Sequence, residues 1–563
     1  MGQLAGWFGK TDNGADALVA MLGAMNALRP ATEELIGEGF ALGTMQPGLA
    51  GDISRIATSD DGKVAVGFAG YLHDEDSEVT SGPAQHCLEL YEQEGARFAS
   101  RLNGTFAVAV LDGRAGRVHL VADRLASRPV YYSEGSPFAF GTNIDAVLAL
   151  PGLRADLNPE RVIEFLALGQ VPATATFCDQ INLVPCGSML TWDGERSHVE
   201  AYWSPQYTWE EEASLDECAD RIAGALRGAV ERICARAGNP VLMLSGGLDS
   251  RATAAASPKP LHCVTMHWSD RAYEVVAARK VARALGHTHE FVPMPEDHPM
   301  GLLELGTALN AGGKSFNHSQ AIYLADRMAE LEPEAILNGW GLDGFFRGGC
   351  LPLVPRTGLW RLAPPRLKHP DKVGSSVDHL VSVGTTVPRE VLCRLCYREP
   401  SEFLAEARVR LGESEARLAE GARSPHDVPE AILLPNLATV VPLADMPAVD
   451  YITAAESAAF DNEVIDAYLR TPPTLRHRHI AYSRAIAKLS PEVARLPYTA
   501  TGVPVSAGPL LEYCMGTPIR CWRAGARYLR RRFSRAPDLT GSWPDIAQTM
   551  ARRPAWQLSL IHI

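Results

Sequence analysis

The sequence predicts an α/β fold in two parts, a layered region of strands and helices followed by a region built on a parallel sheet. Up to about Trp203, short apolar strands are broken by Gly and Asp turns and are interleaved with helical stretches. From Val241 onward, apolar strands alternate with amphipathic helices, which is typical of a parallel sheet. The polar stretch 204–212 lies between the two patterns, so we expect domains at 1–205 and 206–563.

Length, net charge and cysteine content limit the classes of protein to which this chain can belong. The 563 residues exceed one ordinary domain, and the formal charge of −13 disfavours a wide nucleic-acid surface. No apolar run is long enough to span a bilayer, and Met1–Trp7 lacks the pattern of a signal peptide. The 11 cysteines are scattered, as expected for reduced thiols in a cytoplasmic protein. The close pair Cys393 and Cys396 has no second pair, so we expect two ordinary thiols rather than a zinc site.

Local patterns place the individual elements. In the first region they predict strands at 64–68, 106–111 and 118–121, and helices near 15–29 and 83–94. In the second region they predict helices at 215–237, 251–256, 274–285 and 401–422, and strands at 241–244, 261–267, 290–292 and 335–337. Residues 349–430 fit either a substrate-enclosing insertion or a peripheral helical layer, and the layer is favoured.

A Gly-rich turn, Ser245-Gly-Gly-Leu-Asp-Ser250, joins a predicted strand to a predicted helix. This arrangement presents backbone N–H groups to a phosphate, and the glycines let the backbone approach the anion and tolerate positive φ. It lacks the Lys of the P-loop of kinases and GTPases and resembles the pyrophosphate-binding loop of enzymes that cleave ATP to AMP and pyrophosphate. The residues predicted to contact the nucleotide here are Leu244, Ser245, Gly246, Gly247, Asp249 and Ser250.

A second Gly-rich turn follows the next predicted strand, and its residues Asn338 and Gly339 are also predicted to contact the nucleotide. Asp343 lies at the start of the helix that follows. Asp249 and Asp343 would lie at neighbouring strand ends and would form part of a Mg²⁺ shell, since Mg²⁺ also uses waters and substrate phosphates. Met266 lies near the end of the predicted strand 261–267, which stands between the two turns in the sequence. It fits either a residue beside the adenine or an ordinary core Met.

Three segments of the first region, 102–108, 122–132 and 138–142, resemble the glutaminase domain of the asparagine synthetase family. With the two Gly-rich turns, the resemblance covers nearly the whole chain. It implies an N-terminal Ntn-hydrolase-like αββα layered domain followed by an ATP-pyrophosphatase domain, with ATP and Mg²⁺ as cofactors. It also implies that Asp249 and Asp343 bind magnesium and pyrophosphate and act in catalysis. Gly2 stands where the family's glutaminase has its Cys nucleophile, so we expect no glutamine hydrolysis and a domain kept as a platform.

The resemblance implies that a carboxylate attacks the α-phosphate of ATP and that an amine then attacks the acyl-adenylate. Trp340 stands where asparagine synthetase has a Glu and β-lactam synthetase a Tyr, and no Lys lies near 499–501, where the β-lactam enzyme has one. These departures make the chain most similar to a lasso peptide cyclase, which joins a precursor peptide's N-terminal amine to an Asp or Glu side chain. Its partner would be that core peptide, with a leader-binding protein and a leader peptidase as further candidates. Trp340 and the region after Gly349 are candidates for the substrate cavity.

Other functions stay open. A β-lactam synthetase-like or an ammonia-dependent asparagine synthetase-like enzyme would share the same activation chemistry. A tRNA-modifying ATP pyrophosphatase would use Cys393 or Cys396 as sulfur carrier, which the acidic charge balance and the glutaminase-like half disfavour. An inactive scaffold is disfavoured because both Asp249 and Asp343 are intact.

Overall fold

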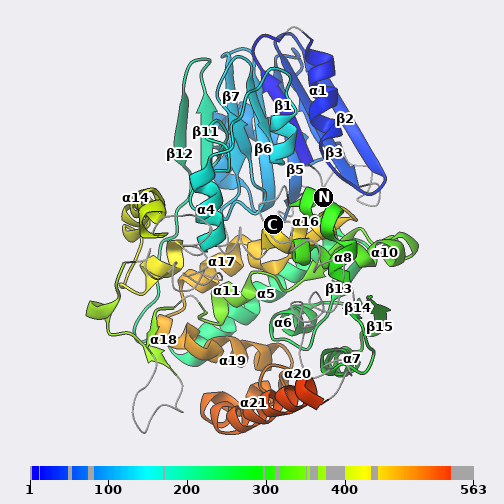
Figure 1. Ribbon diagram of the computed structural model, residues 1–563, viewed down its shortest axis with the longest axis vertical. Coiled ribbons are helices and arrows are strands. Elements are labelled where there is room, and N and C mark those ends of the chain that lie inside the picture. Colours follow the sequence, from blue (N-terminus) through cyan, green and yellow to red (C-terminus); the bar gives the residue numbers. More distant parts are fainter. Residues whose placement is uncertain are drawn as a thin grey trace.

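The structure is a computed structural model, and it is described for most of the chain. The described residues are 3–11, 13–47, 54–73, 82–168, 171–295, 298–310, 316–349, 351–354, 365–375, 379, 400–432 and 442–533. Figure 1 shows the N-terminal strands gathered at one end of the molecule and most C-terminal helices at the other. In the described part, no helix combines the length and apolarity that crossing a membrane requires.

The first region contains two antiparallel sheets of six strands each. One has the order β10-β8-β9-β1-β3-β2, formed by β1 (Gln3–Phe8), β2 (Pro30–Gly37), β3 (Phe40–Pro47), β8 (Tyr131–Ser133), β9 (Phe138–Gly141) and β10 (Asn182–Leu183). The other has the order β12-β11-β7-β6-β5-β4, formed by β4 (Ile56–Thr58), β5 (Val64–Leu72), β6 (Gly104–Asp112), β7 (Arg117–Ala122), β11 (Ser188–Trp192) and β12 (Ser197–Ala201).

Apolar residues pack these sheets into an αββα sandwich. Leu42 and Phe140 of the first sheet pack with Leu120 of the second in a buried cluster between the sheets. A second cluster lies between the first sheet and the helices α1 (Gly14–Gly23) and α3 (Ile144–Leu148). A third lies between the second sheet and α2 (Pro83–Glu94) with the adjoining 3-10 turn η2 (Gly95–Arg101). The predicted layered domain is confirmed.

One predicted helix is too long. The stretch 15–29 is helical only as far as Gly23. Arg29 has φ +51°, which no right-handed helix accepts. Pro30 then begins β2, which pairs with β3 along its whole length. Strand pairing therefore limits the helix at its C-terminal end.

The second region is built on a five-stranded sheet of order β15-β14-β13-β16-β19 in which every pairing is parallel. Its strands are β13 (Pro240–Met243), β14 (His262–His267), β15 (Thr288–Pro293), β16 (Ala335–Asn338) and β19 (Ala454–Ser457). The predicted parallel sheet is confirmed, with β13 one residue earlier than expected and β19 unforeseen. The order reverses at β13, whose two neighbours follow it in opposite directions across the sheet. Ligands of open α/β sheets bind at such a switch point, beyond the carboxyl ends of the strands.

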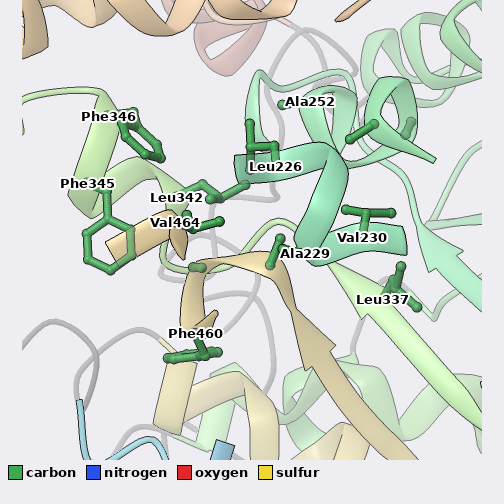
Figure 2. Close-up of a cluster of buried hydrophobic side chains, with 14 of the residues drawn as sticks. Leu226, Ala229, Val230, Ala252, Leu337, Leu342, Phe345, Phe346, Phe460 and Val464 are labelled. Atoms are coloured by element: carbon green, nitrogen blue, oxygen red, sulfur yellow. The ribbon is translucent and has the colours of Figure 1, made fainter. Parts of the chain in front are cut away.

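Helices cover this sheet. The principal ones are α5 (Leu215–Arg236), α6 (Asp249–Ala256), α7 (Tyr273–Leu285), α11 (Leu342–Phe346), α17 (Asn462–Leu469) and α19 (Ile480–Leu489). α5 starts with a capping box in which Ser214 and Glu217 exchange side-chain and backbone hydrogen bonds. Figure 2 shows Leu226 and Val230 of α5 in one apolar cluster with Leu337 of β16 and Phe345 of α11.

Shorter elements complete the described chain. They are α4 (Pro159–Leu168), α8 (His298–Gly301), α9 (Leu303–Leu309), α10 (Ala325–Leu331), α14 (Pro400–Ala419), α16 (Pro442–Asp450), α18 (Pro473–Arg476), α20 (Pro491–Ala494), α21 (Gly508–Phe533), β17 (Leu353–Val354), β18 (Arg366–Leu367) and the 3-10 turns η3 (Phe316–Leu324), η5 (Pro370–Lys372), η6 (Ala458–Phe460), η7 (His477–His479) and η8 (Val505–Ala507). α14 packs on α4, where Arg410 pairs with the buried Glu164 at 2.6 Å. This part of 349–430 is thus a peripheral helix, as expected.

A buried ionic cluster joins the two regions. His73, just after β5, lies 3.3 Å from Glu456 of β19 and 3.4 Å from Asp461 at the start of α17, and all three side chains are inaccessible. Arg236 and Arg232 of α5 pair with the same two carboxylates at 2.5 and 2.8 Å. The domain boundary at residue 205 stays a prediction. Gly2, Cys393 and Cys396 lie outside the described residues.

Candidate active site

The loop Ser245–Ser250 follows β13 at the switch point, and its two serines define its shape. The Ser245 N–H donates to Ser250 Oγ over 2.9 Å, and the two hydroxyl oxygens are also 2.9 Å apart. The Gly247 N–H donates to Ser245 Oγ at 3.2 Å. Both hydroxyls, expected to face a phosphate, are therefore engaged within the loop. The backbone N–H groups of the first turn of α6 have no partner inside the helix and point to this end of the sheet.

The two glycines of the loop serve different purposes. Neither has a positive φ. A Cβ on Gly246 would lie 2.0 Å from Thr499 Cγ2 and 2.8 Å from Ala277 Cβ, so this glycine permits close packing. A Cβ on Gly247 would meet only Ser245 Oγ, at 3.1 Å, within the described residues. Gly247 therefore faces the open side of the loop.

Arg251 fixes the loop from behind. Its guanidinium is fully buried and donates to the carbonyls of Gly246 (3.2 Å), Leu496 (2.9 Å) and Pro497 (2.9 Å). Burial lowers its pKa to about 10, so it remains charged near neutral pH. These bonds tie the loop 245–250 to the segment 493–499.

The second Gly-rich turn lies directly against the first loop. A Cβ on Gly339 would lie 2.5 Å from both the carbonyl carbon of Asp249 and the nitrogen of Ser250, so only glycine fits. Gly341 has φ +86°, a left-handed conformation that suits glycine at the start of α11. Asn338 Oδ1 accepts from the Trp340 N–H at 2.9 Å. The structure thus brings the two predicted turns together at the ends of β13 and β16.

Asp249 lies at the centre of this arrangement. Arg347 Nη1 donates to its Oδ2 at 3.3 Å, and Arg347 Nη2 donates to the Tyr498 hydroxyl at 3.1 Å. Burial raises the pKa of Asp249 to about 7, with Arg347 opposing the shift and the neighbouring Asp343 adding to it. Because the charge of Asp343 affects this pKa, the two predicted metal ligands lie within electrostatic reach of each other.

A cavity of about 490 Å³ opens beside these residues. Its lining comprises Asp343, Arg347, Gly348, Gly349, Leu353, Pro365, His477, Arg478, His479, Tyr498, Ala500, Thr501, Glu512 and Tyr513. Gly349, Leu353 and Pro365 belong to the region that the sequence suggested for a substrate cavity, and that role stays a prediction. Trp340 is not among the lining residues. It is partly buried against the large core, and its carbonyl accepts from the Ser457 hydroxyl at 2.6 Å.

The end of β14 lies next to the loop. Met266 is partly buried and packs against the core of this region, so its role beside an adenine stays a prediction. The next two residues, His267 and Trp268, were not predicted as site residues. His267 stacks on Trp268 with ring centroids 3.8 Å apart. His267 Nε2 and Trp268 Nε1 are both buried without a hydrogen-bond partner among the described residues.

The donors fit a bound Mg²⁺–nucleotide. Asp249 Oδ1 and Asn338 Nδ2 are buried and make no hydrogen bond of good geometry with a described residue. Such atoms are costly to bury unless a ligand satisfies them. Among the described residues no group of three or more His, Cys, Asp or Glu side chains could hold a metal by itself. Two protein carboxylates completed by phosphates and water would suit Mg²⁺.

Two known protein families match this chain, one in each region. The family of the glutamine amidotransferase domain matches residues 72–203, and the asparagine synthase family matches residues 221–485. Together, these two matches and the curated relatives support the asparagine synthetase family. The two Gly-rich turns and the parallel sheet lie within the asparagine synthase match, and most of the second antiparallel sheet lies within the amidotransferase match.

Two curated relatives come from Bacillus subtilis (strain 168). The chain is 29% identical over 210 residues to asparagine synthetase [glutamine-hydrolyzing] 3, covering 33% of this chain and 34% of the relative. It is 27% identical over 203 residues to asparagine synthetase [glutamine-hydrolyzing] 2, covering 33% and 27%. The chain thus matches about a third of the length of these relatives.

Solved structures are more distant. The chain is similar to the allosteric regulatory enzyme of purine biosynthesis, at 11% identity and a TM-score of 0.27 over 52% of this chain and 80% of the other. It is also similar to glutamine phosphoribosylpyrophosphate amidotransferase from B. subtilis complexed with ADP and GMP, at 11% identity and a TM-score of 0.28 over 70% and 92%. At these scores neither similarity establishes more than a distant likeness.

Sequence reasoning missed the residues that connect the site. Arg347 lies four residues after Asp343, a helical spacing that could have suggested a partner for a carboxylate. Tyr498 and Glu512 reach the cavity from segments with no local motif. The basic run His477-Arg478-His479 was visible in the sequence but carries no recognised pattern.

Proposed function

We propose that this chain forms an amide bond in an ATP-dependent reaction, through a carboxyl-adenylate that releases pyrophosphate and then AMP. The observation that carries the proposal is the position of Asp249 and Asp343. They lie at adjacent strand ends of the switch point, and Asp343 also borders a cavity large enough for a substrate. The relatives' names, asparagine synthetase, support the same class of reaction.

Each element of the site has a task in this reaction. The loop 245–250 and the first turn of α6 would bind the phosphates through backbone N–H groups. Asp249 and Asp343 would hold Mg²⁺, which supplies neutralisation of the pyrophosphate that leaves. Arg347, already paired with Asp249, would orient the carboxylate and the phosphates around the α-phosphorus. The partly enclosed cavity would limit access of water to the activated acyl group.

We further propose that the substrate is a peptide and that the product is a macrolactam, as in a lasso peptide cyclase. The cavity of about 490 Å³ exceeds what a single free aspartate needs, and its lining mixes charged, aromatic and small residues. Gly2 in place of a Cys nucleophile points to an amine other than ammonia from glutamine. The core peptide would be the partner, and a leader-binding protein and a leader peptidase would act alongside.

The test measures pyrophosphate release and product mass. The purified chain is incubated with ATP, Mg²⁺ and synthetic peptides that carry a free N-terminal amine and one Asp or Glu at varied distances from it. We expect peptide-dependent pyrophosphate release and a product lighter by one water. Asp249→Asn and Asp343→Asn should reduce both by at least about 100-fold, because each removes a carboxylate that would hold the Mg²⁺ neutralising the departing pyrophosphate.

Parallel reactions separate the alternatives. Pyrophosphate release with free L-aspartate and ammonium, giving asparagine, would assign asparagine synthesis instead of macrolactam formation. Release only with a small β-amino acid would assign the β-lactam reaction. If no carboxylate substrate yields AMP and pyrophosphate, the proposed chemistry is wrong.

A further inference from the structure

The lining of the cavity that Asp343 borders also includes a histidine and a glutamate in direct contact. His479 Nε2 lies 3.1 Å from Glu512 Oε2, with 18% and 15% of the two side chains exposed. His479 ends the turn η7 ahead of α19, and Glu512 lies in α21, so the pair joins segments distant in sequence. Both residues line the same cavity as Asp343.

The contact fixes which nitrogen of the imidazole can accept a proton. A carboxylate only accepts hydrogen bonds, so Nε2 is assigned as the protonated nitrogen and Nδ1 carries the lone pair. In the described part of the chain, the contact between Nε2 and Glu512 is the hydrogen bond that the His479 ring makes. A neutral imidazole oriented by a carboxylate is the arrangement of a general base.

Backbone geometry also sets this position apart. Arg478 and His479 have φ +58° and +49°, two successive non-glycine residues in the left-handed region. This conformation is unfavourable for a residue with a Cβ, and such strained positions cluster at functional sites. The turn is held in place by Arg476, which is fully buried and pairs with Asp427 at 2.9 Å and Glu430 at 2.7 Å.

A continuous set of contacts connects the pair to the nucleotide loop. Asp249 pairs with Arg347, and Arg347 donates to the Tyr498 hydroxyl. The Tyr498 ring meets the His479 ring edge to face, with centroids 6.2 Å apart and planes at 75°. The neighbouring His477 differs in the partner of its ring: its Nε2 donates to the backbone carbonyl of Pro365 at 3.1 Å, and not to a carboxylate.

We propose that His479 is the general base for the amine in the second half-reaction, with Glu512 as its positioning residue. The inference rests on the proposed function. As the amine nitrogen forms its bond to the acyl carbon, His479 Nδ1 takes up the N–H proton. The bond from the acyl carbon to the adenylate oxygen breaks, and AMP leaves with that electron pair. Glu512 holds the imidazole ring and stabilises the imidazolium that results.

The experiment follows the two half-reactions of the full-length chain separately. Isotope exchange between pyrophosphate and ATP, dependent on the same synthetic peptides, reports formation of the adenylate. Loss of one water from the peptide reports amide formation. His479→Asn is the main variant, because Asn adopts left-handed φ readily and should leave the fold intact. His369→Gln is the control, since His369 pairs with Asp371 at 3.2 Å on the surface, with 67% and 85% of the side chains exposed.

We expect His479→Asn to lower the rate of amide formation about 100-fold or more and to reduce exchange far less, with the loss in kcat rather than KM. His479→Gly should be partly restored by added imidazole. Glu512→Gln should lower kcat for amide formation about tenfold with an unchanged melting temperature, and His369→Gln should match the wild type. Equal loss of exchange and amide formation, or none, in His479→Asn would overturn the inference. Absence of exchange in the wild type would instead refute the proposed function.

Discussion

At the scale of the residue, the two glycines of the loop 245–250 allow the same substitution to be compared at a packed and at an open position. We expect Gly246→Ala to lower the free energy of unfolding by about 1 to 3 kcal/mol, as overpacking does, because its Cβ would lie 2.0 Å from Thr499 Cγ2. Gly247→Ala adds the same methyl group on the open side of the loop and should leave stability nearly unchanged. Chemical denaturation of both variants is the measurement. Equal destabilisation would show that the packing around Gly246 is not the cause.

The same pair separates stability from binding. Because Gly247 faces the open side of the loop, its methyl group should hinder the approach of a phosphate to the backbone. Gly247→Ala should therefore raise the KM for ATP at least several-fold while its unfolding curve overlays that of the wild type. An unchanged KM would mean that the phosphates do not contact this part of the loop.

The sequence predicted the identity of the loop but not its internal bonds. A strand, a Gly-rich turn and a helix start are local features, so Asp249 and Asp343 could be selected from the chain alone. The partners of Asp249 could not, because Arg347 and Tyr498 approach through tertiary packing. Neither Gly246 nor Gly247 uses the positive φ that glycine tolerates, and close packing is what requires glycine at 246.

At the scale of the element, the ends of β13 and β16 set the charge state of the site. Asp249 has a pKa of about 7 in the ligand-free protein, raised chiefly by burial. Binding of ATP with Mg²⁺ requires the ionised form of the Asp249 carboxylate. The KM for ATP should therefore rise about tenfold for each pH unit below pH 7. Initial rates at saturating carboxylate substrate, measured from pH 5.5 to 8.5, give this profile.

Arg347 provides the control for that profile. The guanidinium lowers the pKa of Asp249, so Arg347→Met should move the inflection to higher pH. Arg347→Lys keeps the positive charge and should move it less. An inflection at the same pH in all three proteins would assign the titration to another group.

Elements were predicted best where periodicity was strong. The helices at 83–94 and 274–285 and the central strands follow regular apolar patterns, and they lie where expected within one to two residues. β19, Ala-Ala-Glu-Ser, contains a buried Glu456 that pairs with His73 and Arg236, so its sequence does not resemble a core strand. Its place in the sheet depends on partners from distant segments.

At the scale of the whole molecule, His73 links the antiparallel sandwich to the parallel sheet. Burial lowers the pKa of His73, but its ion pairs with Asp461 and Glu456 outweigh that effect and raise the pKa to about 9, above the ordinary value of 6.5. A raised pKa means that the folded state binds the proton more tightly. The resulting stabilisation, on the order of 3 kcal/mol, is complete below pH 6.5 and is lost as the pH rises through about 9.

The melting temperature should therefore fall between pH 6.5 and 9.5 in the wild type. His73→Gln should be less stable at pH 6.5 and show a flatter profile. His119→Gln is the matched control, because burial lowers the pKa of His119 to about 4 and its titration lies outside this range. A decline of equal slope in His73→Gln and the wild type would show that another group causes it.

The overall architecture could be predicted, since alternating patterns distinguish an antiparallel sandwich from a parallel sheet. The cavity could not. Its lining comes from α11, the segments around residues 365, 478 and 500, and α21, which only the folded chain brings together. Trp340, selected from the sequence for this cavity, packs against the core instead.

An isotope experiment that follows the carboxylate oxygen tests whether the carboxylate is activated by transfer of adenylate. A substrate that supports turnover is labelled with ¹⁸O in the reacting carboxylate, and the phosphorus products are analysed by mass spectrometry. The account predicts one ¹⁸O atom in each AMP formed with amide product and none in pyrophosphate. ADP with labelled inorganic phosphate, or unlabelled AMP, would contradict it.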